Sequence, residues 1–170
     1  MQRPHDDDTT EYFRLYTAQA PDGDILLTLA TQIDETLGLL EGLDEERGNF
    51  RYAEGKWTIK EVIGHLVDTE RIFAYRALCF ARGETAPQPG FEQDEYVAMG
   101  DFAKQPLSEI VEDYRLLRAS NLSLFGGFSQ RAWDRHGVAN DSKFRTRSIP
   151  WVLAGHELHH RKVLQERYEL

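Results

Sequence analysis

The sequence predicts an all-α protein, a four-helix bundle with long inter-helix connections. Apolar residues recur at helical spacing in four stretches, and no stretch between them alternates well enough to build a substantial sheet. The four stretches lie near residues 23–42, 58–82, 106–125 and 148–168. The connections 83–105 and 126–147 are long and polar, which argues against a simple up-down-up-down bundle with tight loops throughout.

Two helices are predicted in the first half of the chain. The first carries a single apolar stripe, formed by Leu26, Leu29, Ile33, Leu37 and Leu40. The second begins with a capping box, in which the Thr58 hydroxyl and the Glu61 carboxylate satisfy free backbone N–H groups. Gly83 provides a stop signal for this second helix.

Two further helices are predicted in the second half. The third follows Pro106, and Arg118 and Asn121 interrupt its apolar stripe. The fourth begins near Ser148. It tolerates Pro150 because a proline in the first turn of a helix removes an N–H that has no partner within the helix.

The length of 170 residues fits one ordinary domain. We therefore expect a single domain over residues 1–170, with residues 1–20 as a candidate extended arm. A short helix is expected near residues 92–99, inside the first long connection.

Charge and cysteine content narrow the function classes. Twenty Lys and Arg against 29 Asp and Glu give a net charge of −9, which would repel nucleic acid and anionic membrane surfaces. The single cysteine, Cys79, excludes an internal disulfide and fits a reducing compartment. The N-terminus has no apolar signal core, and no apolar run reaches the ~18 residues that a membrane span needs. We therefore expect a cytoplasmic protein.

Three of the six histidines are expected to point into the bundle. At about 100° per residue, His156 and His160 fall near the middle of the apolar stripe of the fourth helix. His65 falls on the flank of the stripe of the second helix. Imidazoles at positions i and i+4 share one helical face, so both can bind one ion at about 2.0–2.1 Å. The pattern therefore predicts a divalent metal site of His65, His156 and His160 with at least one open coordination position.

Other interpretations of the histidines stay open from the residues alone. Any single imidazole can be a hydrogen-bonded core or surface group, and this interpretation is favoured for His5 and His136. His159 lies at the margin of the stripe, and we expect it outside the ligand set.

Residues 156–160 also spell the His-Glu-x-x-His pattern of zinc proteases. The extended form of that pattern needs glycine and histidine where this chain has Val163 and Glu166. Too few residues follow for the usual downstream ligand, and we find no strand to hold an extended peptide. We therefore expect Glu157 to be an outer-shell or surface carboxylate rather than a peptidase base.

With the helices and histidines placed, the chain resembles the DinB superfamily, four-helix-bundle proteins that include the YfiT-like metal proteins. The resemblance covers about residues 25–168. Its most specific parts are residues 55–70, GKWTIKEVIGHLVDTE, and residues 155–160, GHELHH. It implies that His65, His156 and His160 bind nickel, zinc or a related divalent ion. Residues 71–76, RIFAYR, and 89–91, PGF, are similar to one bacterial branch of the family, but the resemblance gives them no chemical role.

The resemblance also implies a range of reactions. Similar proteins include thiol S-transferases, a mycothiol-dependent isomerase and proteins described as metal-dependent hydrolases. We therefore expect a metal-dependent enzyme that activates a small thiol or water, with thiol transfer slightly favoured and with Cys79 not needed. Phe91, Tyr96 and Trp133 are candidate walls of a substrate pocket, or ordinary packing under the long connections.

Two other function classes stay open. One is a non-catalytic metal- or ligand-binding bundle that acts as a dimer, and a homodimer packed through helices is expected in either case. The other is a structural bundle in which the histidines only form hydrogen bonds. A measurement of bound metal separates the structural bundle, which needs no ion, from the enzyme and the metal-binding bundle.

Overall fold

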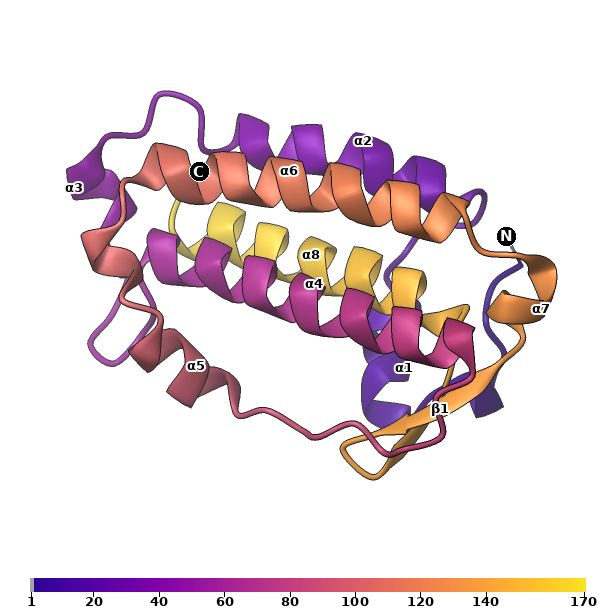
Figure 1. Cartoon of the computed structure of the whole chain (residues 1–170). Helices are drawn as coiled ribbons and strands as arrows, with labels where there is room; N and C mark the ends of the chain where they lie inside the picture. The colour runs from indigo at the N-terminus through magenta and orange to yellow at the C-terminus, as the bar shows by residue number, and fades with distance from the viewer. Residues whose placement is uncertain (1) are drawn as a thin grey trace.

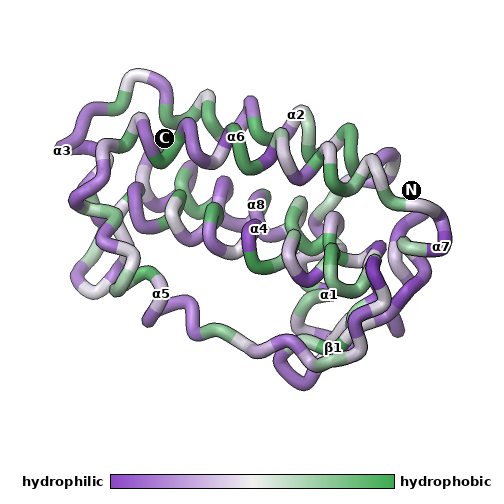
Figure 2. The backbone as a smooth tube through the Cα atoms, in the orientation of Figure 1, coloured by the Kyte–Doolittle hydropathy of each residue, from purple (hydrophilic) through white to green (hydrophobic). Residues whose placement is uncertain are grey.

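The computed structural model describes residues 2–170, and most of them are helical. The four long helices are α2 (Ile25–Gly38), α4 (Ile59–Arg82), α6 (Leu107–Gly126) and α8 (Ser148–Arg167). The predicted all-α bundle is therefore confirmed. The helix boundaries agree with the predicted ones, except that α2 ends at Gly38 rather than near residue 42. Hydrophobic residues recur along these helices between hydrophilic ones (Figure 2).

The bundle has two layers (Figure 1). Helices α2 and α6 form one layer, α4 and α8 form the other, and further contacts join α2 to α8 and α4 to α6. Helices α2 and α4 follow each other in the chain, yet they lie on a diagonal of the bundle, as do α6 and α8. The colour gradient shows that α4 and α6 run in the same direction, opposite to α2 and α8. This order explains the connection 83–105, because α4 and α6 are parallel and the link between them must return along the bundle.

The remaining elements are short. They are η1 (Asp6–Asp8), α1 (Glu11–Thr17), α3 (Glu45–Gly48), α5 (Gln93–Met99), η2 (Phe102–Lys104), α7 (Gln130–Trp133), β1 (His136–Ala139) and β2 (Ser142–Arg145). Helix α5 confirms the short helix expected near residues 92–99.

The antiparallel hairpin of β1 and β2 was not predicted. Its register runs from His136 opposite Arg145 to Ala139 opposite Ser142. Strands this short offer too few positions for alternation to be visible in the sequence. Its turn residues, Asn140 and Asp141, both have positive φ, at 48° and 56°, which is typical of tight hairpins.

The connection after α4 is attached to this hairpin. The backbone N–H of Gln88 donates to the Val138 carbonyl at 2.8 Å, and the Gln88 carbonyl accepts from the N–H of Asn140 at 3.0 Å. The connection therefore passes along the edge of β1 before it reaches α5, as Figure 1 shows.

The N-terminal segment corrects a prediction. Residues 11–17 form helix α1 rather than an extended arm, and α1 packs against α8. A Cβ added at Gly155 would lie 1.8 Å from the carbonyl oxygen of Tyr16, so this close approach requires glycine. Asp8 forms an ion pair with Arg145 and so holds the start of the segment on β2.

A buried ion-pair network lies in the middle of the bundle. Arg118 of α6 donates to both oxygens of Glu70, at 2.8 and 2.7 Å, and to Glu157 at 2.8 Å. Thr36 donates to Glu157 at 2.6 Å, and Asn121 donates to Glu70 at 3.1 Å. The two polar residues that interrupt the stripe of α6 are therefore core residues that link all four long helices.

Candidate metal centre

The three predicted histidines come together between α4 and α8. The capping box at Thr58 and Glu61 forms as predicted, and it fixes the start of α4 about two turns before His65. His156 and His160 project from one face of α8, four residues apart. His65 and His156 are buried, and His160 is half-buried.

The ring nitrogens of these residues converge. The Nε2 atom of His156 lies 3.1 Å from Nε2 of His65 and 3.2 Å from Nε2 of His160. One ligand nitrogen from each residue lies within 4.8 Å of the other two. Ligand nitrogens in a tetrahedral site with bonds of about 2.0–2.1 Å lie roughly 3.3 Å apart, so the spacing fits a divalent ion.

Hydrogen bonding alone does not explain this arrangement. An imidazole nitrogen has one in-plane position, which holds either a proton or a lone pair. The Nε2 atom of His156 can therefore make only one well-aligned hydrogen bond, although two other Nε2 atoms lie at hydrogen-bond distance. One ion between the three nitrogens uses all three lone pairs at once.

The environment keeps the three rings uncharged. Burial, with a smaller effect from His159, lowers the pKa of His65 to about 4. Burial and then the neighbouring His65 and His159 lower the pKa of His160 to about 3. The pKa of His156 is also well below its usual value, first because of burial and then because of the other histidines. Neutral imidazoles are the form that binds metal.

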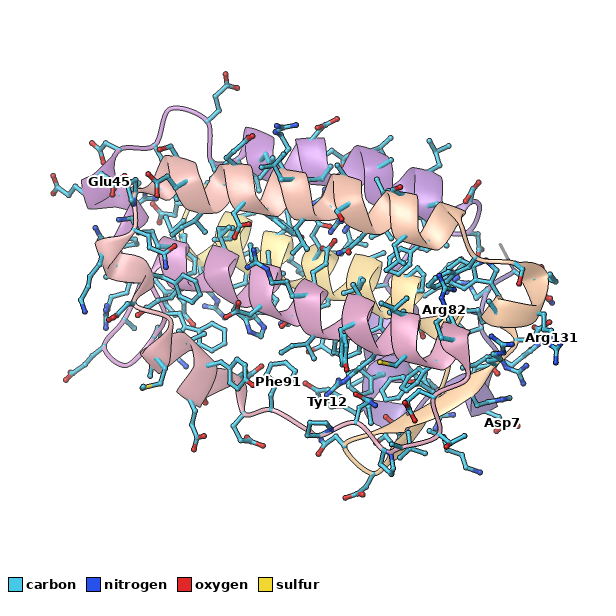
Figure 3. The ribbon with its side chains drawn as sticks, in the orientation of Figure 1. Asp7, Tyr12, Glu45, Arg82, Phe91 and Arg131 are labelled. Atoms are coloured by element: carbon cyan, nitrogen blue, oxygen red, sulfur yellow. The ribbon has the colours of Figure 1, made fainter. Side chains whose placement is uncertain are left out.

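A cavity of about 330 Å³ adjoins the centre. Helices α4 and α8, α1, the hairpin and the segment before α5 all line it. His65 and His156 form part of its wall, and the aromatic rings of Tyr16, Phe73 and Phe91 form another part. In Figure 3 the labelled Tyr12 and Phe91 lie on the side of α4 that faces the long connection.

A shallower hollow lies on the other side of the histidines, with Trp57, His159 and His160 in its wall. The Trp57 ring lies 4.8 Å from the His65 ring and stacks at 6.4 Å on the His160 ring, measured between centroids. Asp94 of α5 borders both the cavity and this hollow.

The predicted pocket walls are only partly right. Phe91 lines the cavity, and Tyr96 lines a smaller hollow next to it. Trp133 is buried against Phe125 and Phe128 in the core and does not line the cavity. The aromatic residues of α1 were missed because residues 1–20 were expected to be extended. Their aromatic spacing is the signal that would have placed a helix there.

The other candidate residues lie outside the cluster. His159 is exposed, as expected, and its ring contacts those of Tyr16 and His160. Glu157 is not on the surface, and its side chain makes its hydrogen bonds to Thr36 and Arg118 rather than to the histidines. It is buried in the Arg118 network, where burial raises its pKa in spite of the nearby guanidinium. Cys79 is a half-buried free thiol that packs against the core.

A comparison with protein families now gives a decisive match. The model of the DinB superfamily matches residues 28–164. The chain belongs to the DinB superfamily. The predicted resemblance is therefore confirmed over most of its length. No curated protein matches the sequence.

Two solved structures of DinB-like proteins share the fold. YfiT from Bacillus subtilis, described as a probable metal-dependent hydrolase with an unusual four-helix bundle topology, superposes with a TM-score of 0.66. It is 14% identical, and the match covers 98% of this chain and 93% of YfiT. The mycothiol-dependent maleylpyruvate isomerase superposes with a TM-score of 0.70 at 14% identity, over 86% of this chain and 61% of the isomerase. At such identities the likeness establishes the fold.

Within residues 2–170, none of the helices has the length and apolarity that crossing a bilayer requires.

Proposed function

We propose that His65, His156 and His160 hold one divalent metal ion, nickel or zinc, and that the protein is a cytoplasmic metal-dependent enzyme. Its reaction is the transfer of a small thiol to an electrophile, with hydrolysis by activated water as the alternative. The observation that carries the proposal is the convergence of three neutral imidazoles beside a cavity, of which His65 and His156 line its wall.

The residues of the chain have separate roles in this proposal. When bound, the ion lowers the pKa of a thiol or water molecule that it coordinates. Three neutral ligands leave the positive charge of the ion uncompensated, which strengthens that effect. The aromatic walls make part of the cavity apolar. The ring of Tyr16 packs against His156, and its hydroxyl, protonated at neutral pH like that of any tyrosine, can donate to a bound substrate.

The surroundings of the centre favour thiol transfer over hydrolysis that depends on a general base. Glu157 is held by Arg118 and Thr36 and has no free oxygen for a general base. Asp94 is the carboxylate that borders both hollows, and it is exposed. A thiol that loses its proton to solvent needs no such base, whereas hydrolysis assisted by a general base needs one. Hydrolysis by water that the ion itself activates needs no base either, so it stays the alternative.

The test compares metal-loaded and chelator-treated protein. One panel combines several small thiols with a generic electrophile, and a second panel contains esters. We expect metal-dependent conjugation in the first panel, unchanged in Asp94→Asn. Ester hydrolysis that Asp94→Asn abolishes would assign the protein to the hydrolases instead. No turnover in either panel, despite a bound ion, would favour the non-catalytic binding bundle.

We also propose that the protein forms a homodimer through its helices. Large apolar side chains are exposed on the adjacent helices α2 and α6, among them Leu27 at 63% and Leu116 at 53%. Sedimentation at tens of micromolar tests this. A species of twice the 19.6 kDa chain mass is expected, and a single species at the chain mass would contradict it.

A further inference from the structure

One face of α4 runs the length of the cavity. His65, Thr69, Phe73 and Arg76 all line it. At about 100° per residue, positions 65 and 76 differ by only about 20° around the helix, and they lie about three turns apart. The cavity therefore extends along α4 from the histidine centre to an arginine.

Arg76 is unusually buried for a charged residue, with 4% of its surface exposed. Its Nη2 atom donates to the carbonyl oxygen of Pro89 at 2.7 Å. Its guanidinium carbon lies 5.0 Å from the centre of the Phe73 ring and 5.8 Å from that of Phe91. These contacts fix the guanidinium at the cavity wall and use only one of its five N–H donors.

No carboxylate neutralises this charge. Among residues 2–170, Arg76 forms no ion pair, whereas the buried Arg118 has two carboxylate partners and the buried Arg147 has one. Burial lowers the pKa of Arg76, as expected for a desolvated cation. Glu92 and Asp94 border the same cavity, but both are exposed and make no hydrogen bond to Arg76. Burying a cation without an anionic partner costs free energy, so a buried arginine at a cavity wall is a candidate site for an anionic ligand.

We propose that Arg76 binds the carboxylate of a small substrate whose other end reaches the histidine centre. The proposal rests on the proposed function and adds the substrate class to it. The remaining guanidinium donors match the planar geometry of a carboxylate. The aromatic residues between the two ends suit an apolar or aromatic body, and a cavity of about 330 Å³ takes only a small molecule. This role also accounts for the 71–76 and 89–91 segments, which supply Arg76, Phe73, Pro89 and Phe91.

The test measures the binding of benzoate and its neutral analogue benzamide to the full chain by calorimetry at neutral pH. Both chelator-treated and nickel-loaded protein are titrated. The wild type is expected to bind benzoate about tenfold more tightly than benzamide, the size of one charge-assisted contact. Arg76→Gln keeps an N–H donor for Pro89 but removes the charge, so it should lower benzoate affinity to that of benzamide and leave benzamide affinity unchanged.

Two controls separate this role from a structural one. Arg82→Gln, an exposed arginine at the end of the same helix, should bind like the wild type. A purely structural Arg76 would lower the affinities for benzoate and benzamide equally, and that result would overturn the proposal. Equal affinities of the wild type for benzoate and benzamide would also overturn the proposal, and this measurement needs no variant. The preference for benzoate is also measured on chelator-treated protein, so it does not depend on a bound ion. A protein that binds no ion would therefore contradict the proposed function without deciding the role of Arg76.

Discussion

At the scale of single residues, the candidate centre depends on where three nitrogen lone pairs point. His65, His156 and His160 bring their Nε2 atoms to one place, and burial keeps the rings uncharged. Helical periodicity was sufficient to predict this set, because ligands at i and i+4 on an apolar stripe are visible in one sequence. The role of Arg76 was not predictable, because it depends on the absence of a carboxylate from elements distant in the sequence.

Trp57 reports on the centre, because its ring packs on those of His65 and His160. We expect Ni²⁺ to quench the emission of Trp57 as it fills the site, measured by fluorescence titration. The Trp57→Phe variant should lose the quenched component while Trp133 and Trp151 still emit. Quenching of equal size in that variant would mean that the ion binds elsewhere.

At the scale of elements, α1 and the Arg118 network hold the helices around the centre. The long helices were predictable because each combines apolar residues at helical spacing with a start or stop signal. The hairpin was not, because its strands are too short to show a period, whereas α1 was missed although its aromatic residues carry a helical spacing. Polar interruptions at Arg118 and Asn121 were visible in the sequence, but their partners Glu70 and Glu157 come from other helices.

Gly155→Ala should separate α1 from α8. Its new Cβ would meet the backbone of Tyr16, which cannot move without the rest of α1. We expect a loss of about 1–3 kcal/mol in the free energy of unfolding, measured by urea denaturation. Gly126→Ala is the matched control, because a Cβ there meets nothing within 4 Å. Equal stabilities of the two variants would show that the contact with α1 is not tight.

Arg118→Met should destabilise the bundle, because it leaves Glu70 and Glu157 buried without their cation. The expected loss is about 3–5 kcal/mol. Arg115→Met on the same helix removes only an exposed pair with Glu112 and should leave stability nearly unchanged. Similar small losses in both variants would contradict a central role for the network.

At the scale of the whole molecule, distant parts of the chain close one cavity. The N-terminal segment, the connection after α4 and the hairpin meet over α4 and α8 (Figure 1). Asp8 joins the N-terminal segment to the hairpin through its ion pair with Arg145. Burial alone would raise the pKa of Asp8, but the N–H of His5 and the charges of Arg145 and Arg147 outweigh it, and the pKa is lowered.

A carboxyl group whose pKa is lower in the folded chain than in the unfolded chain stabilises the fold at pH values above its unfolded pKa. This stabilisation is lost as the pH falls through the pKa of the folded chain. Wild type should therefore be more stable than Asp8→Asn at pH 7. The difference should shrink as the pH falls below about 4, the ordinary range of an aspartate. Urea unfolding of both proteins across this range measures it. A difference that does not depend on pH would show that the charge of Asp8 is not what holds the segment.

The most direct test of the central claim is the metal content of protein purified without a histidine tag, measured by mass spectrometry of the metals. The wild type and His159→Ala should each carry close to one nickel or zinc ion per chain. His160→Ala, one turn from His156, should lose at least about 10-fold in metal affinity and retain little metal after dialysis. Equal retention in His160→Ala and wild type, or no bound ion in either, would contradict the claim that His65, His156 and His160 form a metal centre.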